Sequence, residues 1–246
     1  MKTLFAVDSS GSINGLKIYF KQLRILRDKY YNSERGDKFY TWDNKITYMS
    51  KDEMNKFIDE EKGDGGTEST LIAKMAIENK SEKFEHLIIV TDGMVDKWQI
   101  DECDKLVNEN GIKFSYVSIY IIGYGANESV GCPFCRGCVG KTYKVDENGN
   151  VIKIASVSSN DIKALENINN INNLQEFNNK FENLFNAIRA ECLGKEKNEN
   201  LINKLKDLQN RISIPESERN DFSSKFSKLY GMANGSTRSP ICILAY

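Results

Sequence analysis

The first 125 residues alternate between short apolar runs and segments with helical spacing of apolar residues, and this alternation constrains the fold more than any other feature. Parallel strands need a crossover of a dozen or more residues, usually a helix, so the alternation predicts an α/β fold with a mostly parallel sheet. The turn at 43–45 predicts a hairpin that places one antiparallel strand at the edge. The expected strands are 3–7, 38–42, 46–49, 85–90 and 115–122, and the expected helices are 15–31, 51–60, 67–79 and 97–108.

The alternation stops after residue 125. Residues 126–157 contain three clustered cysteines and a pattern typical of a β-hairpin, and we interpret this stretch as an insertion. Residues 173–192 have the apolar spacing of an amphipathic helix, which we take as the last helix of a domain spanning 1–193. Residues 194–246 predict a helical C-terminal extension with two amphipathic helices separated by Pro215. The apolar residues 241–246 suggest an added edge strand or a segment that packs into a groove.

The composition is that of an ordinary globular protein, with 40% hydrophobic and 28% charged residues among 246. The formal net charge of −1 gives no reason to expect nucleic acid or an anionic membrane as a partner, and no region combines basic with aromatic residues. The apolar run near the N-terminus is too short for a signal peptide, and no stretch approaches the roughly 18 apolar residues of a membrane span. We therefore expect a cytoplasmic protein with reduced thiols.

Three short fragments carry oxygen-bearing side chains at strand ends or helix starts. They are Asp8-Ser-Ser-Gly-Ser12, Gly65-Gly-Thr67 and Thr91-Asp-Gly93. In an open α/β sheet such positions share one edge, where these folds bind ligands. Chain order alone therefore predicts one polar site made from Asp8, Ser10, Ser12, Thr67 and Asp92.

The residue types at this predicted site suit a divalent cation. Mg²⁺ prefers about six oxygen ligands in octahedral geometry and usually keeps some waters. Two carboxylates only cancel the charge of the ion, and three neutral hydroxyls leave it able to accept one more anionic oxygen from outside. The sequence does not distinguish Mg²⁺ from Mn²⁺ or Ca²⁺.

Together the three fragments resemble the metal-ion-dependent adhesion site of the von Willebrand factor A family. That family has Asp-x-Ser-x-Ser after the first strand, a Thr after a glycine-rich loop and an Asp at the end of the fourth strand, and all five positions are matched here in order. The resemblance covers about residues 1–125 and, more loosely, the helix at 173–192. It implies a Rossmann-like doubly wound sheet and a metal ion that binds an Asp or Glu of a protein partner.

The same residues allow catalytic interpretations that fit less well. An Asp after the first strand resembles the nucleophile of haloacid dehalogenase-like enzymes, but Ser10 stands where those enzymes carry a second Asp. A serine nucleophile needs a histidine base, and His86 begins a buried strand on the wrong side of the sheet. We therefore expect no enzymatic activity. A scaffold that binds through its cysteine-rich insertion and C-terminal helices, or a Mg²⁺-dependent hydrolase, are the alternatives to a binding module.

The second informative motif is Cys132-Pro-Phe-Cys135-Arg-Gly-Cys138. Thiolates with this spacing could bind Zn²⁺ with a fourth ligand from elsewhere in the chain. Cys-Pro-Phe-Cys also resembles the active-site tetrapeptide of glutaredoxins, although it lies at a different place in the fold. Small thiols buried in a loop are the third interpretation, and the sequence leaves all three open.

Overall fold

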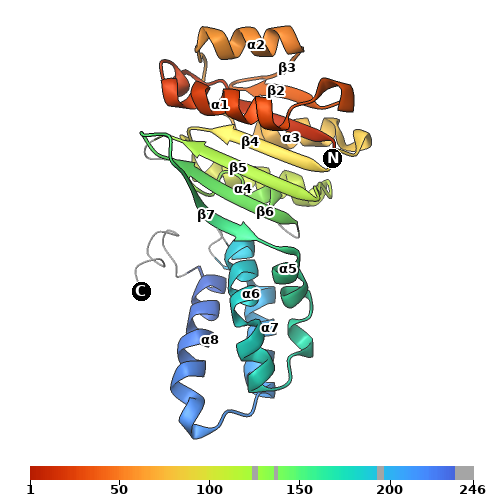
Figure 1. The fold of residues 1–246 in the computed structure, drawn as a ribbon. Coiled ribbons are helices and arrows are strands. Elements are labelled where there is room, and N and C mark those ends of the chain that lie inside the picture. Colours follow the sequence, from red (N-terminus) through yellow and green to blue (C-terminus); the bar gives the residue numbers. More distant parts are fainter. Residues whose placement is uncertain (124–126, 136–137, 193–196, 236–246) are drawn as a thin grey trace. The chain divides into compact units, whose positions relative to one another are not determined.

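A computed structural model describes residues 1–123, 127–135, 138–192 and 197–235, and the chain divides into two compact units (Figure 1). The first unit is Met1–Ala155 and the second is Ser156–Tyr246. The α/β fold belongs to the first unit and a helical fold to the second, so the two are described in turn.

The first unit is built on a mostly parallel sheet with the strand order β3-β2-β1-β4-β5-β6-β7 (Figure 1). The pairs β2–β1, β1–β4, β4–β5 and β5–β6 are parallel, and β3 is antiparallel to β2 at one edge. This confirms the predicted doubly wound α/β class with its antiparallel edge strand. The strands are β1 (Thr3–Asp8), β2 (Lys38–Trp42), β3 (Ile46–Met49), β4 (His86–Thr91), β5 (Tyr116–Ile122), β6 (Val139–Val145) and β7 (Val151–Val157).

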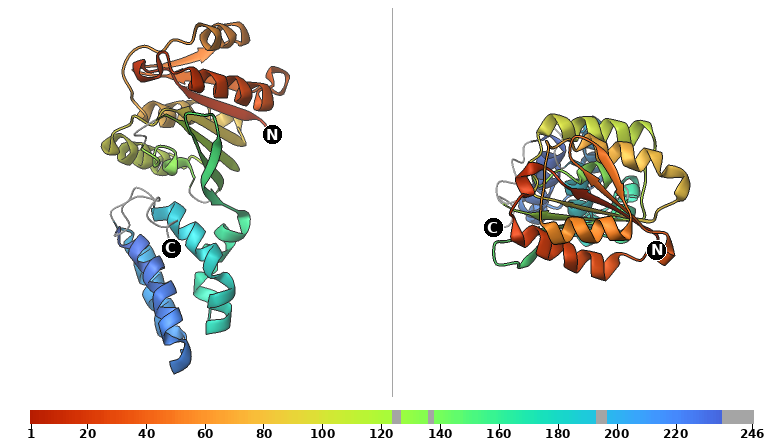
Figure 2. Two further views of the ribbon diagram at one scale, coloured as in Figure 1. Left: turned by 60° about the vertical axis from the view of Figure 1, so that its left-hand side comes forward. Right: turned by 90° about the horizontal axis from the view of Figure 1, so that it is seen from above.

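Both faces of this sheet are covered by helices. Successive side chains of β1 point to opposite faces, so that Phe5 and Val7 lie in one apolar cluster and Leu4 and Ala6 in the other. Helices α1 (Lys17–Tyr30) and α2 (Lys51–Glu60) contribute to the Phe5 cluster, and α3 (Thr70–Glu78) and α4 (Lys97–Glu109) to the opposite one. The view along the sheet shows these pairs on either side (Figure 2). Because both faces are buried, the central strands read as continuous apolar runs.

The hairpin predicted within residues 126–157 exists, but its first strand is an integral part of the sheet. All seven residues of β6 pair with β5 in parallel, from Val139 to Val145. The turn into β7 is closed by Asp146, whose backbone NH donates to the carbonyl of Asn150 at 3.1 Å. The sequence interpretation of 126–157 as an insertion is thus corrected: β6 and β7 belong to the sheet, and of the residues in this stretch before β6 the described ones, 127–135 and 138, form no strand. Backbone pairing with β5 leaves no mark in the local sequence pattern.

In its described residues, the second unit comprises four α-helices around an apolar core. They are α5 (Ser159–Glu166), α6 (Leu174–Cys192), α7 (Glu199–Arg211) and α8 (Arg219–Ala233). Ser158 caps the start of α5 with a capping box: its hydroxyl oxygen accepts from the backbone NH of Asp161 at 3.2 Å, and its own backbone NH donates to the carboxylate of Asp161 at 2.6 Å. The apolar stripes of α6, α7 and α8 share one cluster, in which Phe177, Leu205 and Phe222 are fully or almost fully buried.

This core moves the domain boundary relative to the prediction. The sequence indicates a first domain over 1–193 and an extension over 194–246, whereas the structure divides the chain after Ala155. The physical reason is the stripe of α6, which lies in the same core as α7 and α8. Within the described residues, no helix is long and apolar enough to cross a membrane. The predicted apolar end segment, 241–246, lies outside the described residues.

Candidate metal centre

The candidate site lies where the winding of the sheet reverses. From β1 the chain continues to β2 on one side and later crosses to β4 on the other, and β1 pairs in parallel with both. The crevice at the carboxyl ends of two such strands is where open α/β sheets bind ligands. Asp8 is the last residue of β1 and Asp92 directly follows β4, so both carboxylates lie at this switch point.

The loop after β1 holds its polar side chains close together. The backbone NH of Ser10 donates to Oδ1 of Asp8 at 2.9 Å, and the hydroxyls of Ser10 and Ser12 lie 2.9 Å apart. Asp8 and Ser10 are buried while Ser12 is exposed. The spacing of alternate residues therefore places the hydroxyls of Ser10 and Ser12 side by side in the loop that follows the buried Asp8.

Asp8 is buried without a cationic side chain to balance its charge. Its Oδ2 accepts from the hydroxyl of Thr91 at 2.7 Å, and that hydroxyl accepts from the backbone NH of Gly93 at 2.9 Å. The pKa of Asp8 is raised from 3.8 to about 6, mainly by burial and to a smaller extent by the negative charge of nearby Asp92, against hydrogen bonds from Ser10 and Thr91 that lower it. In the part of the chain that the structure describes, neither Asp8 nor Asp92 forms an ion pair with Lys or Arg.

The loop that carries Thr67 is fastened to both neighbouring segments. The NH of Gly11 donates to the carbonyl of Gly65 at 3.1 Å, which joins this loop to the one after β1. The side-chain amide of Gln99 donates to the carbonyl of Thr67 at 2.9 Å, which joins it to α4. A Cβ on Gly63 would lie 2.1 Å from the carbonyl oxygen of Ser10, so only glycine allows this approach. Thr67 itself is half-buried.

Residues outside the five predicted ligands hold the site residues in place by hydrogen bonds. The phenolic hydroxyl of Tyr19 donates to the backbone carbonyls of Asp8 at 2.8 Å and Val90 at 3.1 Å, and so clamps the ends of β1 and β4 together. Gln99 holds the Thr67 loop by donating to the carbonyl of Thr67, and Thr91 holds the Asp8 carboxylate by donating to its Oδ2. Of these three, only Thr91 carries a sequence signal, because it adjoins Asp92.

The turn between β2 and β3 also reaches this edge of the sheet. Oδ2 of Asp43 accepts from the hydroxyl of Ser9 at 3.1 Å, and its carbonyl accepts from the NH of Glu68 at 3.0 Å. A Cβ on Gly66 would lie 2.5 Å from Oδ1 of Asn44. The sequence predicted only a hairpin turn here, whereas in the structure the turn also contacts the loop that carries Thr67.

The donor set suits a hard divalent cation. Two carboxylates and two hydroxyls lie at the carboxyl ends of β1 and β4, where no Lys or Arg of the described residues pairs with either carboxylate, and oxygen ligands of this kind are those that Mg²⁺ and Ca²⁺ prefer. A bound cation would relieve the unfavourable burial of Asp8. The residues that would hold it are Asp8, Ser10, Ser12, Thr67 and Asp92.

The cysteine motif lies in the apolar core on the α3–α4 face. Cys132 begins the short 3-10 helix η4 (Cys132–Phe134), and Cys135 and Cys138 are both buried in the cluster on this face. The thiol of Cys138 donates to the carbonyl of Phe134 at 3.1 Å. Among the described residues, no group of three or more His, Cys, Asp or Glu side chains is placed to hold a metal ion. Zinc binding by these cysteines stays a prediction.

The single histidine lies at the opposite end of β4 from Asp92. His86 is the first residue of β4, and Asp92 follows the last. Nε2 of His86 lies 2.9 Å from the hydroxyl of Ser118, and burial lowers the pKa of His86 from 6.5 to about 4. Neither Ser10 nor Ser12 thus has an imidazole base beside it.

Fold and site together define a class: a doubly wound α/β domain with a carboxylate and hydroxyl site at its switch point. No family model matches the chain, and no curated protein matches it. Among solved structures, it is similar to a von Willebrand factor type A protein from Catenulispora acidiphila, with 12% identity and a TM-score of 0.41. That similarity covers 59% of this chain and 38% of the other.

Proposed function

We propose that this chain is a protein-binding module in which a divalent cation, held by Asp8, Ser10, Ser12, Thr67 and Asp92, coordinates an acidic residue of a partner protein. The observation that carries the proposal is the pair of buried carboxylates at the switch point, which have no Lys or Arg to balance them among the described residues. The match of all five residues to the adhesion-site pattern of von Willebrand factor A domains supports it.

The chemistry favours binding over catalysis. A cation held by two carboxylates and neutral hydroxyls keeps an affinity for one more anionic oxygen, which a partner's Asp or Glu supplies. The buried serine Ser10 has no imidazole base beside it, since His86, the chain's single histidine, lies at the opposite end of β4. We therefore propose a module without enzymatic activity.

The first test is stabilisation of the purified chain by Mg²⁺, Mn²⁺ or Ca²⁺ after treatment with EDTA. A cation that binds only the folded state stabilises it by about 2.7 kcal/mol at 100 times its Kd. We expect this stabilisation in the wild type and its loss in Asp92→Ala. Asp101→Asn is the matched control, because Asp101 is an exposed carboxylate on α4. A wild type that none of the three cations stabilises would refute the proposed metal centre.

The second test addresses recognition. Protein captured from a lysate by the wild type in Mg²⁺ is compared with that captured by Asp8→Ala, by Asp92→Ala and by the wild type in EDTA. The proposal expects a partner that is lost in all three cases and retained by Asp101→Asn. A partner that survives all three treatments would favour the scaffold alternative, in which contacts are made away from the cation.

A further inference from the structure

The segment that leads from Asp92 into α4 presents two large apolar side chains to solvent. Met94 is 54% exposed and Trp98 is 62% exposed, whereas the chain's other tryptophan, Trp42, is 1% exposed. The residues beside them turn inward, since Val95 and Ile100 are both buried in the core. Met94 and Trp98 therefore face solvent on a segment that also contributes buried side chains to the core.

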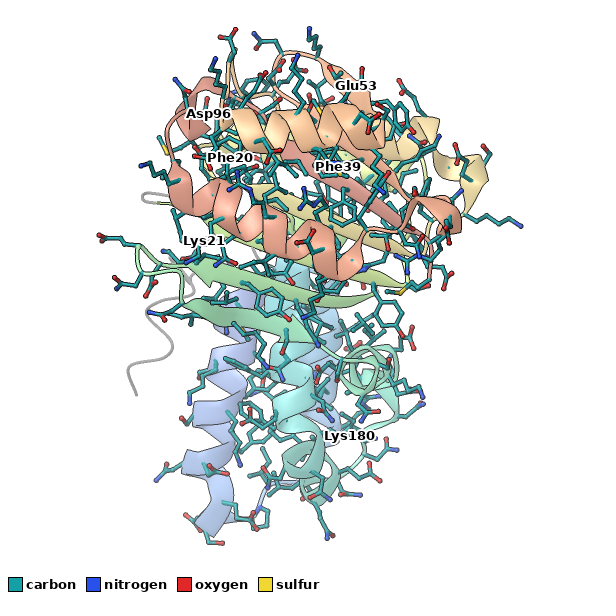
Figure 3. The ribbon with its side chains drawn as sticks, turned by 45° about the horizontal axis from the view of Figure 1, so that its top comes forward. Phe20, Lys21, Phe39, Glu53, Asp96 and Lys180 are labelled. Carbon is teal, nitrogen blue, oxygen red and sulfur yellow. The ribbon has the colours of Figure 1, made fainter. Side chains whose placement is uncertain are left out.

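That backbone is held rigidly to the candidate metal centre. The NH of Met94 donates to Oδ1 of Asp92 at 3.0 Å. Asn127 braces the segment from the other side, with its NH 2.7 Å from the carbonyl of Gly93 and its side-chain amide 3.2 Å from that of Val95. Through Gln99, the first turn of α4 is also joined to Thr67. Asp96, the N-cap residue of α4, lies between Met94 and Trp98 in the sequence and is labelled in the side-chain view (Figure 3).

Exposed tryptophan and methionine in this position indicate a contact surface. Both residue types are enriched at protein interfaces, and tryptophan is among those whose truncation costs most binding energy. Because the backbone that carries them is already ordered by hydrogen bonds, little backbone entropy is lost when a partner covers these side chains. Met94 is joined by its backbone to Asp92, and Trp98 lies in the first turn of the helix that Gln99 joins to Thr67, so both belong to segments that border the candidate site; we call this pair the apolar rim.

We propose that the apolar rim selects partner segments in which the metal-binding Asp or Glu has an aliphatic or aromatic neighbour. This inference rests on the proposed function, because the cation attracts the acidic residue and the rim receives the residue beside it. Charge complementarity with the cation and burial of apolar surface at the rim would act on one peptide at the same time. Acidic segments with only small polar neighbours satisfy the cation and leave the rim exposed.

Two labelled peptide pools test this selection by fluorescence polarisation. Each peptide has a central Asp flanked on both sides by two variable positions, filled from Leu, Ile, Phe and Met in the apolar pool and from Gly, Ser, Thr and Asn in the polar pool. We expect the wild type in Mg²⁺ to bind the apolar pool about tenfold more tightly, as one well-packed aromatic contact allows. EDTA should abolish binding of both pools.

Variants separate this inference from the proposed function. Met94→Ala with Trp98→Ala should reduce binding of the apolar pool to that of the polar pool, while Mg²⁺ still stabilises the protein as in the wild type. The matched control combines Ile25→Ala with Tyr116→Ala, two exposed apolar residues, of which Tyr116 begins β5 at the opposite edge of the sheet. This control should bind as the wild type does.

Equal binding of both pools, or unchanged selection in the rim variant, would overturn the rim and leave the metal centre standing. Binding of neither pool despite stabilisation by Mg²⁺ would also overturn the rim. Absence of both peptide binding and stabilisation would overturn the proposed function, and the rim with it.

Discussion

Replacing Asp8 with asparagine should stabilise the metal-free protein at neutral pH. Burial raises the pKa of Asp8 from 3.8 to about 6, so the folded state holds its proton more tightly than the unfolded chain does. Stability from this group is therefore greatest below the unfolded pKa and falls as the pH rises through the folded pKa. A shift of about two units corresponds to about 3 kcal/mol, since one unit is worth about 1.4 kcal/mol.

Asparagine has nearly the same shape and cannot ionise. Its carbonyl oxygen can still accept from the NH of Ser10, and the hydroxyl of Thr91 can turn to accept from its amide. We expect Asp8→Asn and the wild type to be similarly stable near pH 4 in EDTA, and the variant to become more stable by up to about 3 kcal/mol near pH 7. Adding Mg²⁺ near pH 7 should stabilise the wild type alone.

The assay is urea unfolding followed by tryptophan fluorescence at both pH values. Trp42 and Trp98 are the chain's two tryptophans and both belong to the first unit, so the signal reports on the fold that carries the site. Asp101→Asn serves as the control and should show no such pH-dependent gain. If Asp8→Asn is destabilised equally at both pH values, the hydrogen bonds of the Asp8 carboxylate stabilise the fold by more than the burial of its charge costs, and the reasoning fails.

Three further perturbations test other parts of the structure. In an Asp8→Asn background, the free energy of unfolding should fall by about 3 kcal/mol as the pH falls through the range in which His86 titrates, and adding His86→Gln should abolish this fall. The Asp8→Asn background is needed because Asp8 and His86 titrate in overlapping pH ranges and change the stability in opposite directions. The stabilisation is present above the unfolded pKa of His86, 6.5, and is lost as the pH falls toward about 4. A free energy of unfolding that still falls with pH over this range in the double variant would contradict the prediction. Gly63→Ala should weaken Mg²⁺ binding in calorimetry by about tenfold or more, since its methyl displaces the carbonyl of Ser10, and an unchanged Kd would show that the loop yields without cost. Leu205→Ala, at a fully buried position, should cost about 2–5 kcal/mol in helical unfolding followed by circular dichroism, and a loss below about 1 kcal/mol would place it outside the core.

Much of the first unit follows from local pattern. The apolar run ending at Asp8 and the run ending before Asp92 predict two strands, and the helical spacing between them predicts the crossovers that make these strands parallel. Once the strands are parallel, their carboxyl ends must share an edge. This is why the sequence alone could assemble Asp8, Ser10, Ser12 and Asp92, residues up to 84 positions apart, into one candidate site.

The tertiary structure decided which surfaces meet. An amphipathic stripe such as that of α6 shows that a face is buried but not what covers it, and the structure places it with α7 and α8 in the second unit. Strand pairing likewise brought β6 into the sheet, because hydrogen bonds to β5 leave no trace in residue type.

The properties of the site also depend on contacts between distant segments. The sequence by itself determined which side chains stand at the strand ends and that their oxygens suit a divalent cation. Only the fold decided that Asp8 is buried beside Asp92, that Tyr19 clamps their strands together, and that Met94 and Trp98 face outward next to them. Burial and proximity are properties of packing in three dimensions, and a local pattern specifies them only in part.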